Sequence, residues 1–202
     1  MTKIKLCGMM RAIDIETANI LRPDYIGFVF AEKSKRYVSP DAARALRNCL
    51  HPDIQAVGVF VQHPPEYIAD LLNGGVIDIS QLHGGESAEY IHCLRALTDK
   101  PILQAVRVTD EHDLERASRS LADMILLDNG AGGTGEAFNW NLLRDFDRPY
   151  FLAGGLDAQN VEAAVRAYHP FAVDVSSGIE SNGAKDAEKM RTFVEAVRRA
   201  TE

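Results

Sequence analysis

Cysteine is scarce in this sequence of 202 residues, and the few cysteines present are poorly placed for a disulfide framework or a zinc site. Only Cys7, Cys49 and Cys93 occur, an odd number at wide spacing and without a CxxC pair. This pattern argues against a disulfide-stapled secreted domain and against a metal centre, and the six histidines show no metal-ligand spacing. Cys49 and Cys93 fall within expected helices, where we expect small buried apolar residues, as most free cysteines are.

Long apolar runs and an excess of positive charge are also missing. No stretch approaches the ~18 apolar residues of a transmembrane helix, and the start, MTKIKLCGMM, lacks the apolar core of a signal peptide. Lys and Arg number 22 against 29 Asp and Glu, a net charge of −7, which gives no reason to expect nucleic acid or an anionic membrane as partner. We therefore expect a cytoplasmic protein whose partner is a small molecule.

What the sequence does contain is a series of eight short apolar runs that alternate with amphipathic stretches. Runs that are nearly continuously apolar are typical of parallel strands covered on both faces. The predicted strands are Ile4–Cys7, Tyr25–Phe30, Ile54–Val61, Ile77–Leu82, Ile102–Val108, Met124–Asp128, Tyr150–Ala153 and Phe171–Val175.

Helical signals fill the intervals between these strands. Ser39 followed by Pro40, for example, supplies an N-cap residue and a proline at the first helical position. The predicted helices are Asp14–Leu21, Asp41–Leu50, Pro65–Leu72, Ala88–Leu97, Asp110–Ser118, Trp140–Asp145, Ala158–Ala167 and Lys185–Arg199. Eight strand–helix units, repeating every ~20–31 residues, predict an α/β fold with a single (β/α)8 TIM barrel over residues 1–202. A doubly wound open sheet is the alternative that the alternation alone leaves open.

In such a barrel the chemistry lies at the carboxyl ends of the strands. The first strand ends at Cys7, and Gly8 allows close approach of a ligand; a buried cysteine without function is the alternative. Lys33, Lys35 and Arg36 follow the second strand and could bind a carboxylate or phosphate, or be solvated loop charges. Arg36 is the strongest candidate of the three, because its guanidinium can bind an anion through two nitrogens.

Polar residues also end the fourth and sixth strands. Strand alternation sends Gln81 and His83 to the same side, where His83 could be an acid, a base or a structural histidine. Asp128 ends the sixth strand and could act chemically or cap the next turn. Residues 130–135 match GxGxxG, but the motif does not open directly into a helix, so a mobile loop over the site is favoured over a dinucleotide site.

Glycine-rich turns follow the last two strands. Gly154 and Gly155 come after the seventh strand, and Ser176 and Ser177 after the eighth. Barrels of this kind hold a phosphate at these two loops through backbone N–H groups and a helix N-terminus. These four residues are therefore the predicted phosphate site, although isolated glycines would be ordinary turns.

Taken together, these strand ends resemble the phosphoribosylanthranilate isomerase family of tryptophan biosynthesis, over essentially the whole chain. The segments that carry the resemblance are Lys5-Leu6-Cys7-Gly8, Gly27-Phe28-Val29-Phe30, Ser34-Lys35-Arg36-Tyr37-Val38, Gln81-Leu82-His83-Gly84, Leu126-Leu127-Asp128, Gly132-Gly133-Thr134-Gly135, Ala153-Gly154-Gly155-Leu156 and Asp174-Val175-Ser176-Ser177-Gly178-Ile179-Glu180.

The resemblance implies a barrel of the ribulose-phosphate-binding type that catalyses an Amadori rearrangement. N-(5-phosphoribosyl)anthranilate would become 1-(2-carboxyphenylamino)-1-deoxyribulose 5-phosphate, with neither metal nor redox cofactor because hydrogen moves within the substrate. By family analogy Asp128 is the general acid, Cys7 is the general base and Arg36 holds the anthranilate carboxylate. Gln81, His83 and Asp174 are expected to contact the substrate, and the protein to be a monomer or a homodimer.

Four other readings remain. A pentose-phosphate epimerase would be expected to use metal ligands at the strand ends, and an indole-glycerol-phosphate synthase a catalytic Lys/Glu set; neither is evident. The histidine-pathway aminoaldose isomerase uses paired aspartates, whereas Cys7 stands at the base position here. A non-catalytic barrel that only binds a phosphate ligand is the last alternative, against which the presence of both Cys7 and Asp128 argues.

Overall fold

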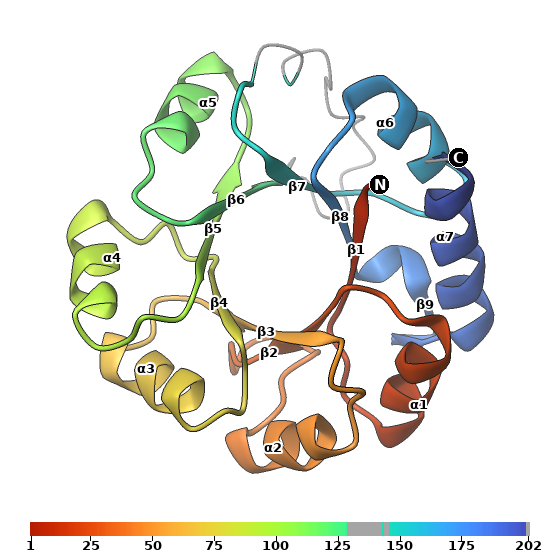
Figure 1. The fold of residues 1–202 in the computed structure, drawn as a ribbon, viewed down its shortest axis with the longest axis horizontal. Coiled ribbons are helices and arrows are strands. Elements are labelled where there is room, and N and C mark those ends of the chain that lie inside the picture. The colour runs from red at the N-terminus through yellow and green to blue at the C-terminus, as the bar shows by residue number, and fades with distance from the viewer. Residues whose placement is uncertain (129–142, 144–145, 201–202) are drawn as a thin grey trace.

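Eight parallel strands close into a barrel in the computed structural model, which describes residues 1–128, 143 and 146–200. The strands follow chain order around the barrel, and β8 pairs with β1 to close it. In Figure 1 the strands surround the barrel axis and the helices lie outside them. The strands are β1 Lys3–Cys7, β2 Tyr25–Val29, β3 Gln55–Phe60, β4 Ile79–Leu82, β5 Ile102–Arg107, β6 Met124–Asp128, β7 Tyr150–Ala153 and β8 Ala172–Val175. The predicted TIM barrel is confirmed, and the open sheet is excluded.

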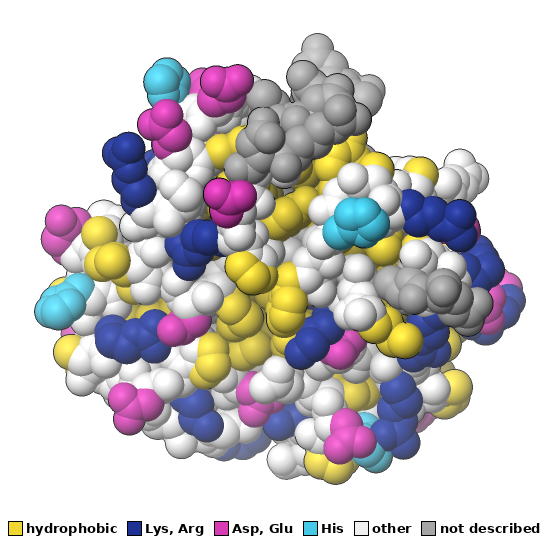
Figure 2. All heavy atoms as spheres, turned by 45° about the horizontal axis from the view of Figure 1, so that its top comes forward, with side chains coloured by type: hydrophobic (Ala, Val, Ile, Leu, Met, Phe, Trp, Pro, Cys, Tyr) yellow, Lys and Arg dark blue, Asp and Glu magenta, His cyan; other side chains and the backbone are white. Residues whose placement is uncertain are grey.

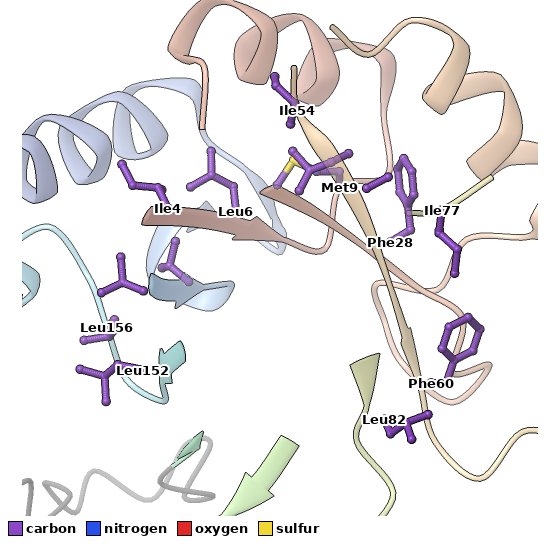
Figure 3. Close-up of a cluster of buried hydrophobic side chains, with 14 of the residues drawn as sticks. Ile4, Leu6, Met9, Phe28, Ile54, Phe60, Ile77, Leu82, Leu152 and Leu156 are labelled. Atoms are coloured by element: carbon purple, nitrogen blue, oxygen red, sulfur yellow. The ribbon is translucent and has the colours of Figure 1, made fainter. Parts of the chain in front are cut away.

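Side-chain alternation along the strands divides the core into two layers. One layer fills the barrel interior and includes Tyr25, Leu103 and Phe151. The other lies between strands and helices; Figure 3 shows Ile4 and Leu6 from this layer on the same side of β1. Because successive side chains point to opposite faces of a strand, Lys5, which lies between these two, points inward. The polar groups at the carboxyl ends of the strands are therefore aimed at the mouth of the barrel.

The outer helices begin largely where the capping signals predict. The Ser39 hydroxyl accepts a hydrogen bond from the Ala42 amide at 3.3 Å at the start of α2, with Pro40 as the first helical residue. The helices are α1 Ala12–Leu21, α2 Pro40–Asn48, α3 Pro65–Asn73, α4 Ala88–Arg95, α5 Glu111–Ser118, α6 Val161–Tyr168 and α7 Ala187–Ala200. The predicted glycine-rich loop at 130–135 lies outside the described residues, as does the predicted helix Trp140–Asp145 apart from Leu143.

The last helix does not begin at Lys185 as predicted. After β8 the chain forms a short 3-10 turn, η2 Ser177–Ile179, and then an antiparallel hairpin of β9 Glu180–Ser181 and β10 Ala184–Lys185. The two-residue turn is Asn182-Gly183, with both residues in the left-handed region at φ 53° and 79°. An Asn-Gly turn of this kind matches the twist of a hairpin, so the dipeptide was a signal that the sequence interpretation missed.

The face of the molecule drawn in Figure 2 has no large region of one charge. Figure 2 shows Lys and Arg side chains mixed with Asp and Glu side chains over the visible face. In the part of the chain that the structure describes, no helix is long and apolar enough to cross a membrane.

Candidate active site

A pocket of about 470 Å³ opens at the carboxyl ends of the barrel strands. The final residues of β1, β2, β5, β6, β7 and β8 all line it. The structure brings ten predicted site residues to this pocket: Cys7, Arg36, Gln81, His83, Asp128, Gly154, Gly155, Asp174, Ser176 and Ser177. Lys33 and Lys35, the other two basic candidates after the second strand, are exposed and do not line it. Residues separated by up to 170 positions in the chain therefore share one mouth because the barrel closes.

Cys7 sits low in this pocket and is only 7% exposed. Its sulfur packs with Val29 and Val59, and Gly27 on the neighbouring strand leaves room for it, since a Cβ there would lie 2.6 Å from the sulfur. Burial raises the pKa of the Cys7 thiol, although the nearby Lys5 and Lys185 ammonium groups favour the thiolate. Cys7 is therefore largely a thiol at neutral pH.

A buried ion pair lies beneath Cys7. Lys5 and Asp174 face each other across the β1–β8 pairing, and Lys5 Nζ lies 2.7 Å from Asp174 Oδ1. The Lys5 side chain is completely buried, and that of Asp174 is 11% exposed. Burial alone would lower the pKa of Lys5, but the Asp174 carboxylate outweighs it and raises that pKa. Lys5 thus stays charged and provides a fixed cation under the sulfur.

The opposite side of the pocket holds a looser set of polar groups. Gln81 Nε2 lies 3.1 Å from His83 Nδ1, and His83 Nε2 lies 3.5 Å from Asp128 Oδ2. His83 and Asp128 are 40% and 25% exposed at their side chains. Gln81 Oε1 is buried and has no hydrogen-bond partner among the described residues. The prediction that Gln81 and His83 point to the same side is confirmed.

Arg36 is held at the rim by a carboxylate of the β9–β10 hairpin. Its Nε and Nη2 donate to Glu180 Oε1 and Oε2 at 2.6 and 2.9 Å. Lys185 Nζ donates to the same Glu180 Oε1 at 2.7 Å and also to the backbone oxygen of Ser176 at 2.9 Å. Burial alone would raise the pKa of Glu180, but the Arg36 and Lys185 hydrogen bonds lower it to about 2.

The predicted phosphate loops meet at the third side of the pocket. Gly154 and Gly155 adopt φ angles of 90° and 66°, which L side chains rarely adopt, so their turn requires glycine. Ser176 is tied to the first strand, since its hydroxyl donates to the backbone oxygen of Cys7 at 3.2 Å. Ser177 opens the short turn η2, as in barrels where a short extra helix follows the last strands.

Sequence reasoning assigned no role to several residues in or behind the pocket. Glu180 only ends a motif in the sequence, Lys185 falls in a predicted helix, and no sequence pattern marks Arg107 at the end of β5. The close approach expected at Gly8 is made by the protein itself, since a Cβ there would lie 2.6 Å from Arg36 Cδ. The hairpin that carries Glu180 and Lys185 places both side chains beside Arg36.

The expectation for the other two thiols is wrong. Cys49 and Cys93 are both exposed, whereas Cys7 is buried. Cys49 follows the last turn of α2, and Cys93 lies on the outer side of α4. The apolar faces of these helices are filled by other residues, so the cysteines are left at the surface. In the described part of the chain, no cluster of His, Cys, Asp and Glu could hold a metal ion.

The family model for N-(5'-phosphoribosyl)anthranilate (PRA) isomerase matches residues 4–196, nearly the whole chain. The chain belongs to this family. The PRA isomerase of Thermoanaerobacter sp. strain X514 is 45% identical, and that of Endomicrobium trichonymphae is 43% identical. Each alignment covers 98% of this chain and at least 98% of the relative. The predictions of the family and of an isomerase are confirmed.

Solved structures of PRA isomerases superimpose over the same length. The Thermotoga maritima PRA isomerase matches with a TM-score of 0.89 at 37% identity, covering 98% of this chain and all of the other. Another, in complex with reduced 1-(o-carboxyphenylamino)-1-deoxyribulose 5-phosphate, matches with a TM-score of 0.86 at 36% identity, with the same coverage. These likenesses support the barrel and the family; the roles of individual residues rest on the geometry of the pocket.

Proposed function

We propose that this protein catalyses the Amadori rearrangement of N-(5'-phosphoribosyl)anthranilate to 1-(2-carboxyphenylamino)-1-deoxyribulose 5-phosphate. The observation that carries the proposal is the placement of Cys7 and Asp128 across one pocket that also contains a guanidinium and two glycine-containing phosphate loops. A thiol base, a carboxylic acid and two anion sites are the groups that this substrate and this reaction require.

Asp128 acts as the general acid. It donates a proton to the ribose ring oxygen, the C1–O bond breaks, and a protonated Schiff base forms at C1. Its neighbour His83, with Nε2 3.5 Å from Asp128 Oδ2, contacts the substrate from the same side together with Gln81. The buried and unpartnered Gln81 Oε1 is an acceptor suited to a substrate hydroxyl.

Cys7 acts as the general base. Its thiolate removes the C2 proton of the Schiff base, and the enol that results becomes the ketone when C1 takes up a proton and the C2 hydroxyl loses one. Lys5 and Lys185 stabilise the thiolate, which reduces the cost of its burial without cancelling it. Asp174, whose carboxylate lines the pocket and is 11% exposed, lies beside the substrate hydroxyls.

The two anionic ends of the substrate are held by separate parts of the mouth. Arg36 binds the anthranilate carboxylate, and the backbone N–H groups near Gly154, Gly155, Ser176 and Ser177 bind the phosphate. The proposal needs neither a metal nor a redox cofactor, and it places a small phosphoribosyl compound as the partner of a cytoplasmic protein. Either a monomer or a homodimer is compatible with it; one solved relative is a monomer generated from a dimeric enzyme of Thermotoga maritima.

The test is a fluorescence assay of freshly prepared phosphoribosylanthranilate with the purified protein. We expect loss of the substrate signal at a rate proportional to enzyme concentration, with formation of the ketose product by mass spectrometry. A folded protein that binds the product without turning over the substrate would contradict the proposal and support the non-catalytic alternative.

A further inference from the structure

The Arg36 guanidinium has two edges, and the structure uses only one of them. The group carries five N–H donors in a plane. Glu180 takes the Nε–H and one Nη2–H, which form the side edge of the plane. Nη1 and the second Nη2–H form the end edge, which has no hydrogen-bond partner among the described residues. The unused edge has the spacing that a second carboxylate needs for two parallel hydrogen bonds.

Glu180 is itself held from several elements. Lys185 of β10 lies 2.7 Å from it, and Lys35 of the loop after β2 lies 3.8 Å from it. Lys189 of α7 donates to its backbone oxygen at 2.7 Å. The Glu180 and Lys185 side chains are 7% and 0% exposed. The carboxylate therefore has little freedom to move, and neither has the guanidinium that it clamps.

We propose that Glu180 is a positioning residue, which fixes Arg36 side-on so that the free end edge of the guanidinium binds the carboxylate of an aromatic amine ligand. The inference rests on the proposed function, since it deepens the role given there to Arg36. Glu180 touches no substrate atom; it acts through Arg36 alone.

The physical gain is preorganisation and not charge. Three cations surround the Glu180 carboxylate, namely Arg36, Lys35 and Lys185, so the cluster keeps a net charge of +2 and still attracts an anion. A free arginine side chain must lose rotamer freedom when it binds a ligand, which weakens binding by about 2- to 13-fold. Glu180 already orders the Arg36 side chain when the protein folds. The ligand carboxylate therefore binds a rigid guanidinium without further loss of rotamer freedom.

The experiment compares two ligands that differ only in the carboxylate. One is reduced 1-(o-carboxyphenylamino)-1-deoxyribulose 5-phosphate, and the other is the same compound with a phenyl group that lacks the carboxylate. The ratio of their dissociation constants, measured by titration calorimetry, isolates the carboxylate because both ligands share the phosphate and the sugar. For the wild type we expect a ratio of ~10–150, the scale of a hydrogen-bonded charged group.

Three variants separate position from charge. Glu180→Gln keeps the shape but replaces one acceptor by a donor, so the ratio should fall by at least ~2-fold. Glu180→Asp keeps the charge with a shorter reach, and its ratio should lie between those of wild type and Glu180→Gln. Arg36→Lys keeps the positive charge without a fork, and its ratio should fall at least as far as that of Glu180→Gln.

A matched control exists on α7, where Glu188 binds Arg191 through Nε at 3.1 Å and through Nη2. This pair has the same side-on form as Arg36–Glu180 but is exposed at the surface. Glu188→Gln should leave both affinities unchanged. Circular dichroism will check the fold of each variant, and Glu180→Asp with Arg36→Lys keeps the test valid if Glu180→Gln does not fold.

The outcomes distinguish this inference from the proposed function. If Glu180→Gln weakens both ligands equally, or leaves the ratio at or above that of wild type, Glu180 is merely structural and the inference is overturned while the isomerase activity stands. If the wild type binds both ligands with a ratio near one, Arg36 does not hold the carboxylate and the inference falls with it. A falling ratio in a protein without turnover would support the inference and contradict only the acid–base roles.

Discussion

The two sides of the barrel mouth are built differently. On the β1–β8 side, Cys7 lies above the buried Lys5–Asp174 pair and beside Lys185, whose side chain is fully buried. On the β4–β6 side, His83 and Asp128 are partly exposed and 3.5 Å apart. The first side is assembled and desolvated before any ligand arrives, whereas the second is open.

This difference matches the chemistry proposed for each side. A carboxylic acid can exchange its proton with solvent between turnovers, so exposure of Asp128 does not hinder it. A thiolate next to apolar residues needs fixed cations, because burial disfavours its charged form. Cys7 is only 7% exposed, so a thiolate there needs the buried cations of the β1–β8 side.

The largest expected effects fall on the proton-transfer groups of the two sides. Cys7→Ala and Asp128→Asn should each lower kcat by ~10²–10⁴-fold, because each removes one proton-transfer group and little core volume. Steady-state kinetics with circular dichroism will measure this, and Cys49→Ala, at the surface, serves as a control with wild-type kcat. Turnover near that of wild type in one variant would remove that residue, and its side of the mouth, from the mechanism.

The next effect concerns stability and distinguishes the buried side from the open one. Lys5→Met should lower the free energy of unfolding by about 3–5 kcal/mol, because it leaves the Asp174 carboxylate unpaired in a buried place. Urea denaturation will measure the change.

Adding Asp174→Asn to Lys5→Met should recover part of the loss, since the unpaired charge is then gone. On the open side, His83→Asn should change the free energy of unfolding by less than about 1 kcal/mol. Equal losses for Lys5→Met and His83→Asn would contradict the contrast between the two sides.

A smaller effect is expected on stability at acid pH, where Glu180 of the β9–β10 hairpin becomes protonated. The pKa of Glu180 is about 2, against an ordinary value of 4.5, so its charged form stabilises the fold above pH 4.5 and this contribution is lost as the pH falls toward 2. The difference in unfolding free energy between wild type and Glu180→Gln should therefore shrink by about 1–3 kcal/mol over this range, less than the full linkage value because of solvent screening.

Urea titrations at several pH values will measure that difference. Glu188→Gln, which removes an exposed carboxylate that also pairs with an arginine, should show no comparable change. A difference for Glu180→Gln that is constant between pH 5 and 2 would mean that Glu180 is not held as a charged group.

The smallest effect is the order in which the three thiols react. An unburied thiolate at Cys7 would be the fastest of the three to react, but Cys7 is buried with a raised pKa while Cys49 and Cys93 are exposed. In the ligand-free protein near pH 8, iodoacetamide should modify Cys49 and Cys93 at least about tenfold faster than Cys7.

Peptide mass mapping over time separates the three thiols, and activity should be lost in step with the slow Cys7 reaction. Bound product should slow the modification of Cys7 and leave the rates at Cys49 and Cys93 unchanged. Loss of activity in step with either exposed thiol, or full activity after Cys7 has reacted, would overturn its assignment as the base.

Much of the fold could be predicted because its signals are local. The apolar runs gave the eight strands to within a few residues, and capping residues such as Ser39 marked helix starts. The sequence does not predict the β9–β10 hairpin, because strands of two residues are too short to show a periodic pattern. The turn dipeptide Asn182-Gly183 is the signal in the sequence that indicates it. The burial of the cysteines was also misjudged, since the chain neighbours of Cys49 and Cys93 do not specify which face of a helix meets the barrel.

By itself the sequence determined the barrel, the order of its strands and the polar residues at their ends, because strand periodicity and turn residues act over a few positions. Only the tertiary structure decided which charges meet. Lys5 faces Asp174 because β8 closes onto β1, and Arg36 meets Glu180 because the β9–β10 hairpin brings that carboxylate to the loop after β2. Such pairs join residues more than 140 positions apart, and their energies depend on burial and distance, which exist only once the chain has closed.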